Sequence, residues 1–459
     1  MKKTLLMTLL AGLVSASQLV QATEVFITGS TAFRKNVHDA CLKMFNPGGS
    51  VAFAEIDDTN SILGQGSGSG NGAYAWVMSG TPTNSLGLIT DTLVIHASFT
   101  GSLQGSFAVQ QGTEIEWLGT NAGGTTLVTN SATIAFSDVF TSSSLWTALP
   151  SNYQEDTVGI QPFAFVKSQS SGAGQTTMNN ITNVSWEQVK GLYEDGELPL
   201  SFWTGLDSDT NTPIYLVNRT LDSGTRRTIG AETDHKWLFN APVYMFNTGT
   251  NAGNFTWAKY NTTDSANTNN VVGPAGYGNV NYANSIFSWG PGCVGGGDLR
   301  GVLNGTSVNN TSIGYLSFSD AQSAWSGSTW LGLLTFEGGL PTAALPSNAS
   351  ATNANDFTPV IEGKYPYWAE EVVFFPTTQT QLNQAGDQKI TQPQLGSKGS
   401  GLASGTFLGL LDYQGGGTNF VGGSVENEIV NSKPNTNIPL YKMRVNHNNL
   451  TSLITPGHY

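Results

Sequence analysis

The sequence predicts an α/β protein whose largely parallel sheet is covered by helices on both faces. Short apolar runs that suit buried strands alternate along the chain with amphipathic stretches that suit helices. Turns of glycine, serine and threonine follow several of the apolar runs. Because ligands bind beyond the carboxyl ends of strands in such sheets, we expect these polar turns to form a ligand site.

The first strand, predicted over 25–28, leads directly into a helix predicted over 34–45. Apolar residues recur in this helix at spacings of three and four, from Val37 to Ala40 and Cys41. The turn between strand and helix consists of Ser30, Thr31, Ala32 and Phe33. These residues stand at a helix start, where backbone N–H groups favour an anion. A plain strand-to-helix connection is the simpler interpretation.

Two more predicted strands end in polar residues. The strand over 93–97 is followed by Gly101 and Ser102, for which an ordinary connection is again the simpler interpretation. The strand over 133–136 is followed by Asp138. An aspartate at a strand end is most often a helix N-cap, so capping is the simpler role for Asp138.

Further along, two apolar runs over 160–166 and 214–217 predict strands. The clearest predicted helix lies between them, over 185–193. Its apolar residues recur at spacings of three and four from Trp186, and Ser185 is placed to cap its first turn.

The segment 217–225 places one arginine beside hydroxyls, a glycine and backbone amides. Arg219 carries five donors in a planar fork that matches phosphate or carboxylate geometry. Ser223, Thr225 and the amide of Gly224 can donate from the opposite side, and a helix that starts near Thr225 would add its dipole. Taken alone, the segment suits a surface turn whose hydroxyls cap a helix while Arg219 pairs with an acid.

In their order along the chain, these four polar segments resemble those of the phosphate-binding periplasmic solute-binding proteins, the receptors of phosphate ABC transporters. The matching segments are the turn at 29–33, the Gly-Ser pair at 101–102, the Ser-Asp pair at 137–138 and the Arg-x-x-x-Ser-Gly-Thr segment at 219–225. Two later segments, 313–316 and 361–366, resemble strands of the family. The order and spacing of the segments carry the resemblance.

The resemblance implies a type II periplasmic-binding-protein fold, an α/β structure with two lobes, two crossing strands and a ligand cleft between the lobes. We expect the crossings near 160–168 and 365–375. The expected organisation is a signal peptide over 1–22, the first part of lobe 1 over 23–164, lobe 2 over 165–366 and the return part of lobe 1 over 367–459.

The resemblance also implies a set of phosphate-binding residues. In this sequence they are Ser30, Thr31, Ala32, Phe33, Ser102, Asp138, Arg219, Ser223, Gly224 and Thr225. Hydrogen phosphate keeps a proton that the Asp138 carboxylate can accept, whereas sulfate has none and would face an unpaired charge. This favours phosphate over sulfate. One departure from the family is Leu221, because many relatives carry an acid at that position; here the acid is Asp222.

The N-terminal residues predict a secretory signal peptide, because Lys2 and Lys3 precede an apolar run and a small-residue cleavage site that ends at Ala22. Its removal takes away two lysines and changes the formal charge from −13 to −15. A chain this acidic repels nucleic acid and anionic lipid, so neither is an expected partner. No later apolar run approaches bilayer-spanning length. We therefore expect a periplasmic protein that does not span the membrane.

Cys41 and Cys293 are the two cysteines, and they leave either one disulfide or two thiols. Neither they nor the five histidines have the spacing of a metal site. Ser102 and Ser223 have no histidine in a recognised nucleophile–base arrangement. We therefore expect no enzymatic activity, no metal and no cofactor.

Together these expectations describe a monomeric extracytoplasmic protein that captures inorganic phosphate for an ABC transporter permease. A surface or structural protein on the same fold, without a role in phosphate uptake, is one alternative. A binder of another phosphorus oxyanion, such as a phosphonate, is the other.

Overall fold

The computed structural model describes residues 22–46, 52–56, 62–63, 75–99, 101–120, 127–141, 149–220, 223–232, 244–248, 255–259, 293, 295–306, 308–326, 332–344, 355–384, 390–396, 405–411, 437–439, 442–448 and 451–456. All structural statements refer to these residues. Most of the predicted signal peptide, and both Leu221 and Asp222, lie outside them.

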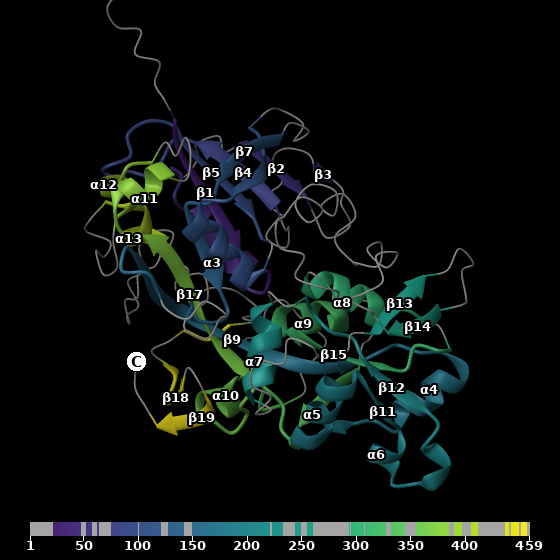
Figure 1. Cartoon of the computed structure of the whole chain (residues 1–459). Helices are drawn as coiled ribbons and strands as arrows, with labels where there is room; N and C mark the ends of the chain where they lie inside the picture. Colours follow the sequence, from purple (N-terminus) through teal and green to yellow (C-terminus); the bar gives the residue numbers. More distant parts are fainter. Residues whose placement is uncertain are drawn as a thin grey trace, which may run out of the picture.

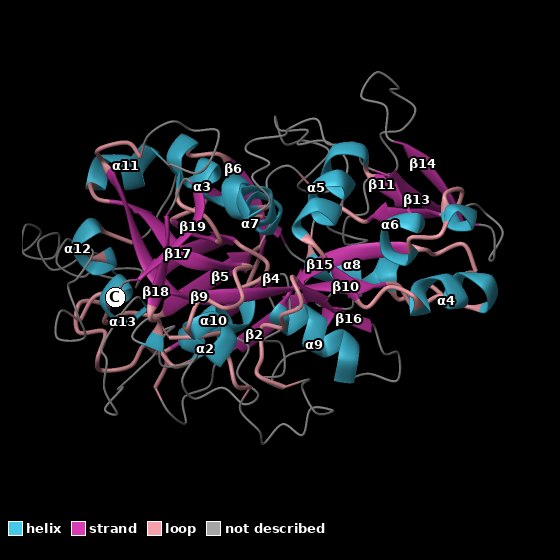
Figure 2. Ribbon diagram, turned by 90° about the horizontal axis from the view of Figure 1, so that it is seen from below, coloured by secondary structure: helices cyan, strands magenta, loops and turns pink. Residues whose placement is uncertain are grey.

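The described residues form a mixed α/β structure built on one sheet of 13 strands. Figure 2 shows helices on both sides of the strands, with α3 (Ser102–Gln111) and α5 (Trp186–Asp195) on one side and α2 (Arg34–Leu42) and α9 (Phe318–Ser326) on the other. The predicted α/β class is confirmed. The strands gather into two groups, visible at the upper left and lower right of Figure 1, which we call the first half and the second half.

The first half contains the N-terminal strands. In spatial order they are β17 (Trp368–Pro376), β8 (Ile134–Ser137), β1 (Thr23–Gly29), β5 (Leu93–Ser98), β4 (Ala75–Gly80), β2 (Ala52–Ile56) and β3 (Ile62–Leu63). A separate hairpin is formed by β6 (Glu114–Leu118) and β7 (Leu127–Ser131). Besides α2 and α3, this half carries α11 (Gln379–Gln384), α12 (Gln392–Leu395) and α13 (Phe407–Leu411) (Figure 1).

The second half is built from the middle of the chain. Its strands are β11 (Glu197–Pro199), β12 (Pro213–Leu216), β15 (Ser312–Ser317), β16 (Gly332–Phe336) and β10 (Asn183–Val184), and its hairpin is β13 (Tyr244–Thr248) with β14 (Phe255–Lys259). Its helices besides α5 and α9 are α4 (Gly172–Asn179), α6 (Ser201–Thr204), the 3₁₀ turn Asp207–Asp209, α7 (Gly224–Glu232), α8 (Gly296–Leu303) and α10 (Thr358–Ile361). Near the C-terminus β18 (Val445–Asn448) pairs with β19 (Thr451–Pro456).

One long strand joins the two halves. β9 (Tyr153–Lys167) has 15 residues, enough to belong to both. Its first part, up to Pro162, pairs with β17 of the first half, and its last part, from Phe163, pairs with β15 of the second half. The chain returns beside it, because β17 starts at Trp368 opposite Pro162. Both crossings therefore lie where the sequence predicts them.

The expectation of a largely parallel sheet is wrong. Parallel pairing is found in the core of each half, where β1 pairs with β5 and β8 and where β12 pairs with β15. The crossing strands β9 and β17 run in opposite directions between the halves, so they pair antiparallel with each other and with their neighbours β15 and β8. Edge strands such as β4 are antiparallel as well. The result is a mixed sheet.

Each half packs around its own hydrophobic core. Val25, Phe136 and Phe375 belong to a cluster in the first half, whereas Phe163 and Tyr315 belong to a cluster in the second. The two cysteines are divided in the same way, because Cys41 is buried in the first cluster and Cys293 in the second. The possible disulfide between them is therefore not formed, and both side chains are thiols.

Local sequence explains where the clearest helix begins. Ser185 caps α5 through its Oγ, which accepts from the backbone N–H of Gln188 at 3.2 Å, while the side chain of Gln188 accepts from the Ser185 N–H at 2.9 Å. This reciprocal capping box is worth roughly 1 kcal/mol.

The prediction of a strand over 361–366 is wrong, because Ile361 ends α10 and the strand starts later, at Trp368. Among the described residues, no helix has the length and apolar character needed to cross a membrane.

Candidate functional site

Three parallel strands of the first half end at the same edge of the sheet, and the polar turns follow them there. β1 is followed by Ser30, β5 by Gly101 and β8 by Asp138. Gly29 makes this close convergence possible, because its φ is +113° and a Cβ on it would lie 1.9 Å from the Phe136 carbonyl oxygen. The N–H of Ser30 donates to that carbonyl at 2.7 Å, and the N–H of Gly101 donates to the Gly29 carbonyl at 2.9 Å.

Asp138 receives hydroxyl donors from both halves. Ser30 Oγ donates to its Oδ1, and Thr225 Oγ1 donates to its Oδ2 at 3.0 Å. The backbone N–H of Asp138 donates to Ser102 Oγ at 3.3 Å. With 3% of its surface exposed, Asp138 is a buried acid whose carboxylate is held by side-chain hydroxyls, one of them from Thr225 in the first turn of α7.

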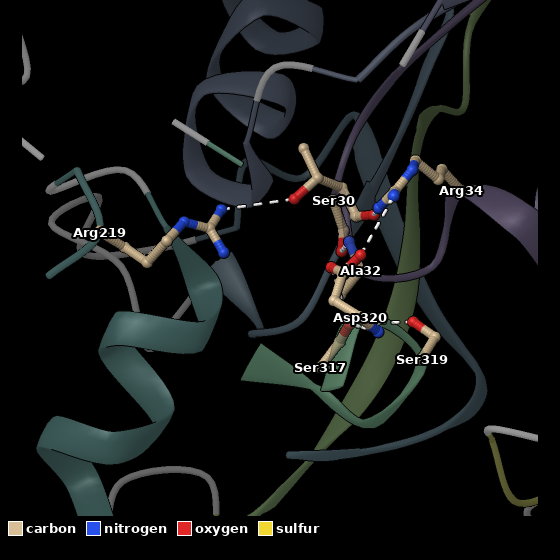
Figure 3. Close-up of polar contacts among 8 residues, drawn as sticks. Ser30, Ala32, Arg34, Arg219, Ser317, Ser319 and Asp320 are labelled. Carbon is tan, nitrogen blue, oxygen red and sulfur yellow. Dashed lines mark hydrogen bonds and ion pairs between the residues drawn. The ribbon is translucent and has the colours of Figure 1, made fainter. Parts of the chain in front are cut away.

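Arg219 reaches toward the same place from the second half. Its Nη2 donates to Thr31 Oγ1 at 3.3 Å, across the boundary between the halves (Figure 3). Its Nε donates to the Cys293 carbonyl at 3.1 Å, so a backbone oxygen helps to hold the guanidinium. The side chain is 3% exposed, which places a permanent cation in a buried setting.

The helix α7 begins beside Asp138. A Cβ on Gly224 would lie 2.6 Å from Ser102 Oγ and 2.7 Å from Asp138 Cβ, so only glycine fits at this point of contact between the halves. Ser223 precedes it, and its Oγ accepts from the Arg226 N–H at 3.3 Å in the manner of a helix cap. The N-terminus of α7 is therefore directed at the predicted site, where its dipole favours an anion.

The structure thus brings together most of the predicted set. Ser30, Thr31, Ser102, Asp138, Arg219, Gly224 and Thr225 are connected by these contacts, and Ser223 adjoins them. Ala32 uses its N–H to donate to Ser30 Oγ at 3.2 Å. The Phe33 ring points into the core, where it stacks on Phe136. That all ten residues bind phosphate stays a prediction.

Two other cations stand near this set. Arg34, at the start of α2, forms a buried ion pair of 3.2 Å with Asp320 of α9 and also donates to the Thr31 carbonyl (Figure 3). Burial alone would raise the pKa of Asp320, but the Arg34 and Arg300 guanidiniums hold it below its usual value. Arg226 donates to the Arg219 carbonyl at 2.7 Å and thereby supports that residue from behind.

One acid near the site has no counterpart in the predicted set. Glu371 of β17 is fully buried, and burial followed by the negative charge of Asp138 raises its pKa well above the usual range. The sequence offers one signal for it, because this acid stands within a strand that is otherwise mostly apolar.

Among the described residues, no group of three or more histidine, cysteine, aspartate or glutamate side chains could hold a metal ion.

Comparison with known proteins gives matches among solved structures only. No family model and no curated protein sequence matches the chain. A phosphate transport receptor from Vibrio cholerae is 12% identical, with a TM-score of 0.33 over 80% of this chain and 94% of that one. A candidate phosphate ABC transporter substrate-binding protein with bound phosphate, from Clostridium perfringens, is 13% identical, with a TM-score of 0.37 over 80% and 90%.

A phosphate-binding protein from Stenotrophomonas maltophilia is 13% identical, with a TM-score of 0.33 over 79% of this chain and 81% of that one. The chain is similar, over about four fifths of its length, to phosphate-binding proteins of ABC transporters.

Proposed function

We propose that this protein captures inorganic phosphate between its two halves and delivers it to the permease of an ABC transporter. The observation that supports this most directly is the setting of Asp138, a buried acceptor among groups that donate. The Ser30 and Thr225 hydroxyls donate to its carboxylate, and Arg219 donates to the hydroxyl of Thr31, the residue next to Ser30. Donors of this kind satisfy an anion, and the single acid is suited to a ligand that carries a proton.

Hydrogen phosphate matches this combination of groups. Its oxygens can accept from Arg219, from the hydroxyls of Thr31 and Ser102, which act only as acceptors in the contacts above, and from the N-terminus of α7, and its one proton can be donated to Asp138. Sulfate would leave the carboxylate facing a second negative charge with no proton between them, which is costly in a buried site. Phosphate is therefore the ligand that we favour.

Further parts of the proposal rest on the sequence. We propose export to the periplasm by the segment 1–22, a monomer without enzymatic activity, and lobe boundaries at 164/165 and 366/367. These boundaries lie close to Pro162, where the β9–β17 pairing ends, and just before Trp368.

One observation favours the alternative of a structural protein. The hydroxyls of Ser30 and Thr225 already bond to Asp138, so the contact could hold the two halves together without a ligand. Such a protein would fold correctly and bind no phosphate. A binder of a phosphonate would use the same donors with a different remainder of the ligand.

Titration calorimetry on the purified mature protein separates these functions. Inorganic phosphate, sulfate and methylphosphonate are titrated separately, after any carried-over anion has been removed by partial unfolding and refolding. We expect one-to-one binding of phosphate and thermal stabilisation, which amounts to ~2.7 kcal/mol at a ligand concentration 100 times the Kd. A well-folded protein whose melting temperature is the same with and without millimolar phosphate would contradict the proposal.

A further inference from the structure

Glu371 is a buried acid that the predicted site does not use. It lies in β17, where a register shift separates it from Val372, and its side chain is 0% exposed. Neither carboxyl oxygen meets a donor in good hydrogen-bond geometry among the described residues, but the Asp138 carboxylate and the Ser30 hydroxyl lie close enough to interact with this group. Two polar side chains, Asp138 and Ser30, lie near enough to shift its pKa. Glu371 therefore stands behind the one acceptor of the predicted phosphate site.

A carboxylate in this position would be unstable as an ion. A buried carboxylate whose oxygens are poorly satisfied by donors loses its hydration with little in return, so such a group takes up a proton instead. Asp138 strengthens this effect, because two neighbouring carboxyl groups in a dry site do not both ionise readily.

The pKa of Glu371 follows the same causes. Burial raises it most, the negative charge of Asp138 and the bond to its carboxylate raise it further, and the Ser30 hydroxyl acts in the opposite direction. The elements packed on β17 are β8, β9, α3, α7 and α11. Their charged residues are Glu155, Asp156, Lys167, Arg226, Arg227 and Glu232, and β17 itself adds Glu370; none of these is among the groups that shift the pKa of Glu371.

We propose that Glu371 is a neutral carboxylic acid that donates its proton to Asp138, so that the two buried carboxyl groups carry one negative charge between them. The consequence for the ligand rests on the proposed phosphate function. An anion entering the site then meets one negative charge instead of two.

The shared proton also determines how many ligand protons Asp138 can accept. A carboxylate has about four acceptor positions. Ser30 and Thr225 occupy one each, and the Glu371 hydroxyl takes a third. A single position remains, which suits an oxyanion that carries one hydroxyl, as hydrogen phosphate does. Glu371 is thus a positioning residue that selects the protonation state of the ligand.

The first test needs no ligand. Thermal unfolding is followed across pH for the wild type, for Glu371→Gln and for Glu370→Gln, a neighbouring glutamate of the same strand that is partly exposed. Because the folded pKa of Glu371 is raised, its contribution to stability is fully present below the ordinary glutamate pKa and is lost as pH rises through the folded pKa. The amide of Glu371→Gln does not titrate. We therefore expect the melting temperature of this variant to rise relative to that of the wild type as pH increases. The Glu370→Gln profile should run parallel to the wild type. Parallel profiles for Glu371→Gln would overturn the proposal.

A second measurement on the wild type covers the case in which Glu371→Gln does not fold. Carboxyl-labelled glutamate is titrated by carbon NMR, and we expect one resonance to remain protonated at neutral pH and to move in Asp138→Asn. Glu155 also has a raised pKa, through burial, but it bonds to Thr141 and should not respond to that variant. The proposal fails if no single glutamate resonance shows both properties, namely protonation at neutral pH and a shift in Asp138→Asn.

Ligand binding then separates the two proposals. The ratio of phosphate affinities of Glu371→Gln and the wild type is measured at each pH, so that titration of phosphate itself cancels. We expect this ratio to rise at alkaline pH. A wild type that binds no phosphate, but keeps the protonated resonance, would remove the proposed function and leave the shared proton intact. Phosphate binding with a ratio that stays flat across pH would overturn the role of Glu371 in the site.

Discussion

At the scale of single residues, the proposed function depends on one acceptor and one permanent cation. Asp138 accepts from Ser30 and Thr225, while Arg219 donates to Thr31 from the other half. These side chains are buried, so their hydrogen bonds are strong and any unpaired group among them is costly. Substitutions here should change ligand preference before they change the fold.

Asp138→Asn should weaken the discrimination against sulfate. The amide places a donor where the carboxylate only accepts, and it removes the charge that repels a fully deprotonated anion. We expect the ratio of sulfate Kd to phosphate Kd to fall by about 10-fold or more, since recognition of a ligand proton can supply up to ~10⁴-fold. Calorimetry with both anions measures the ratio. Asp91→Asn is the matched control, because Asp91 accepts from Thr23 at the opposite end of β1. Continued exclusion of sulfate by Asp138→Asn would refute the role of this carboxylate.

Arg219→Lys should weaken phosphate binding by roughly 10- to 100-fold, which corresponds to the ~1.5–3 kcal/mol of a hydrogen bond to a charged group. An ammonium keeps the charge but cannot grip the anion at two points while it also donates to the Cys293 carbonyl. Affinity for phosphate measures the effect. If the loss appears in Arg226→Lys and not in Arg219→Lys, the wrong arginine has been assigned.

At the scale of elements, the site is made where strands end and helices begin. β1 leads into α2, and β5 leads through Gly101 into α3, whose N-cap has a φ of 135°. In the other half α7 starts at Gly224, against Ser102 and Asp138. Two elements from opposite halves therefore approach within van der Waals contact, and that approach depends on the missing side chain of one glycine.

Gly224→Ala should reduce phosphate binding by preventing this approach. The added methyl group would lie 2.6 Å from Ser102 Oγ, so α7 and the first half must move apart. We expect a loss of affinity of at least about 10-fold, which an overpacking penalty of ~1–3 kcal/mol would produce. Gly301→Ala in α8 is the control, because a Cβ there meets nothing within 4 Å and alanine favours a helix. Equal affinities of the two variants would contradict a tight contact at Gly224.

At the scale of the whole molecule, the two halves are held together by a few polar contacts beside the crossing strands. Besides Arg219 with Thr31 and Thr225 with Asp138, the buried pair of Arg34 and Asp320 joins α2 of the first half to α9 of the second. These contacts join the two halves to each other. Under the proposed function, we expect motion at the crossing strands to break them.

Asp320→Asn should favour the open arrangement. Removing one partner of a buried ion pair typically costs ~3–5 kcal/mol, because the other charge is left uncompensated. Small-angle scattering should show a larger radius of gyration for this variant, and phosphate should restore part of the compaction. Glu362→Gln, which breaks an exposed pair with Lys364, is the control and should leave the scattering unchanged. Identical curves for Asp320→Asn and the wild type would argue against a role of the pair in closure.

The same pair predicts a pH dependence. The folded pKa of Asp320 is held below its usual value, so its contribution to stability is present above the ordinary aspartate pKa, ~3.9, and is lost as pH falls through the folded pKa. The wild type should therefore lose stability faster than Asp320→Asn on acidification in that range. Melting temperatures between neutral and acidic pH provide the measurement, and equal slopes would count against the ion pair.

The sequence by itself predicted the local elements and the polar segments of the site. Apolar periodicity located β1, β5, β8 and α5, and the order of the polar turns indicated which residues would meet. These features are readable because a strand or helix start depends on residues a few positions apart. The turn residues had simpler interpretations as caps and connections, and only their contact across the halves separates Asp138 from an ordinary cap.

The tertiary structure decided everything that depends on residues distant in the chain. Strand direction was mispredicted because β9 and β17 reverse between the halves, and no local pattern records this reversal. The disulfide was excluded because Cys41 and Cys293 lie in separate cores. Glu371 lies near Asp138, 233 positions earlier in the chain, only because β17 pairs with β8, the strand that Asp138 follows. Interactions between residues a few positions apart can be predicted from the local sequence. The burial of a side chain and the charges around it depend on residues far away in the chain, which only the tertiary structure brings together.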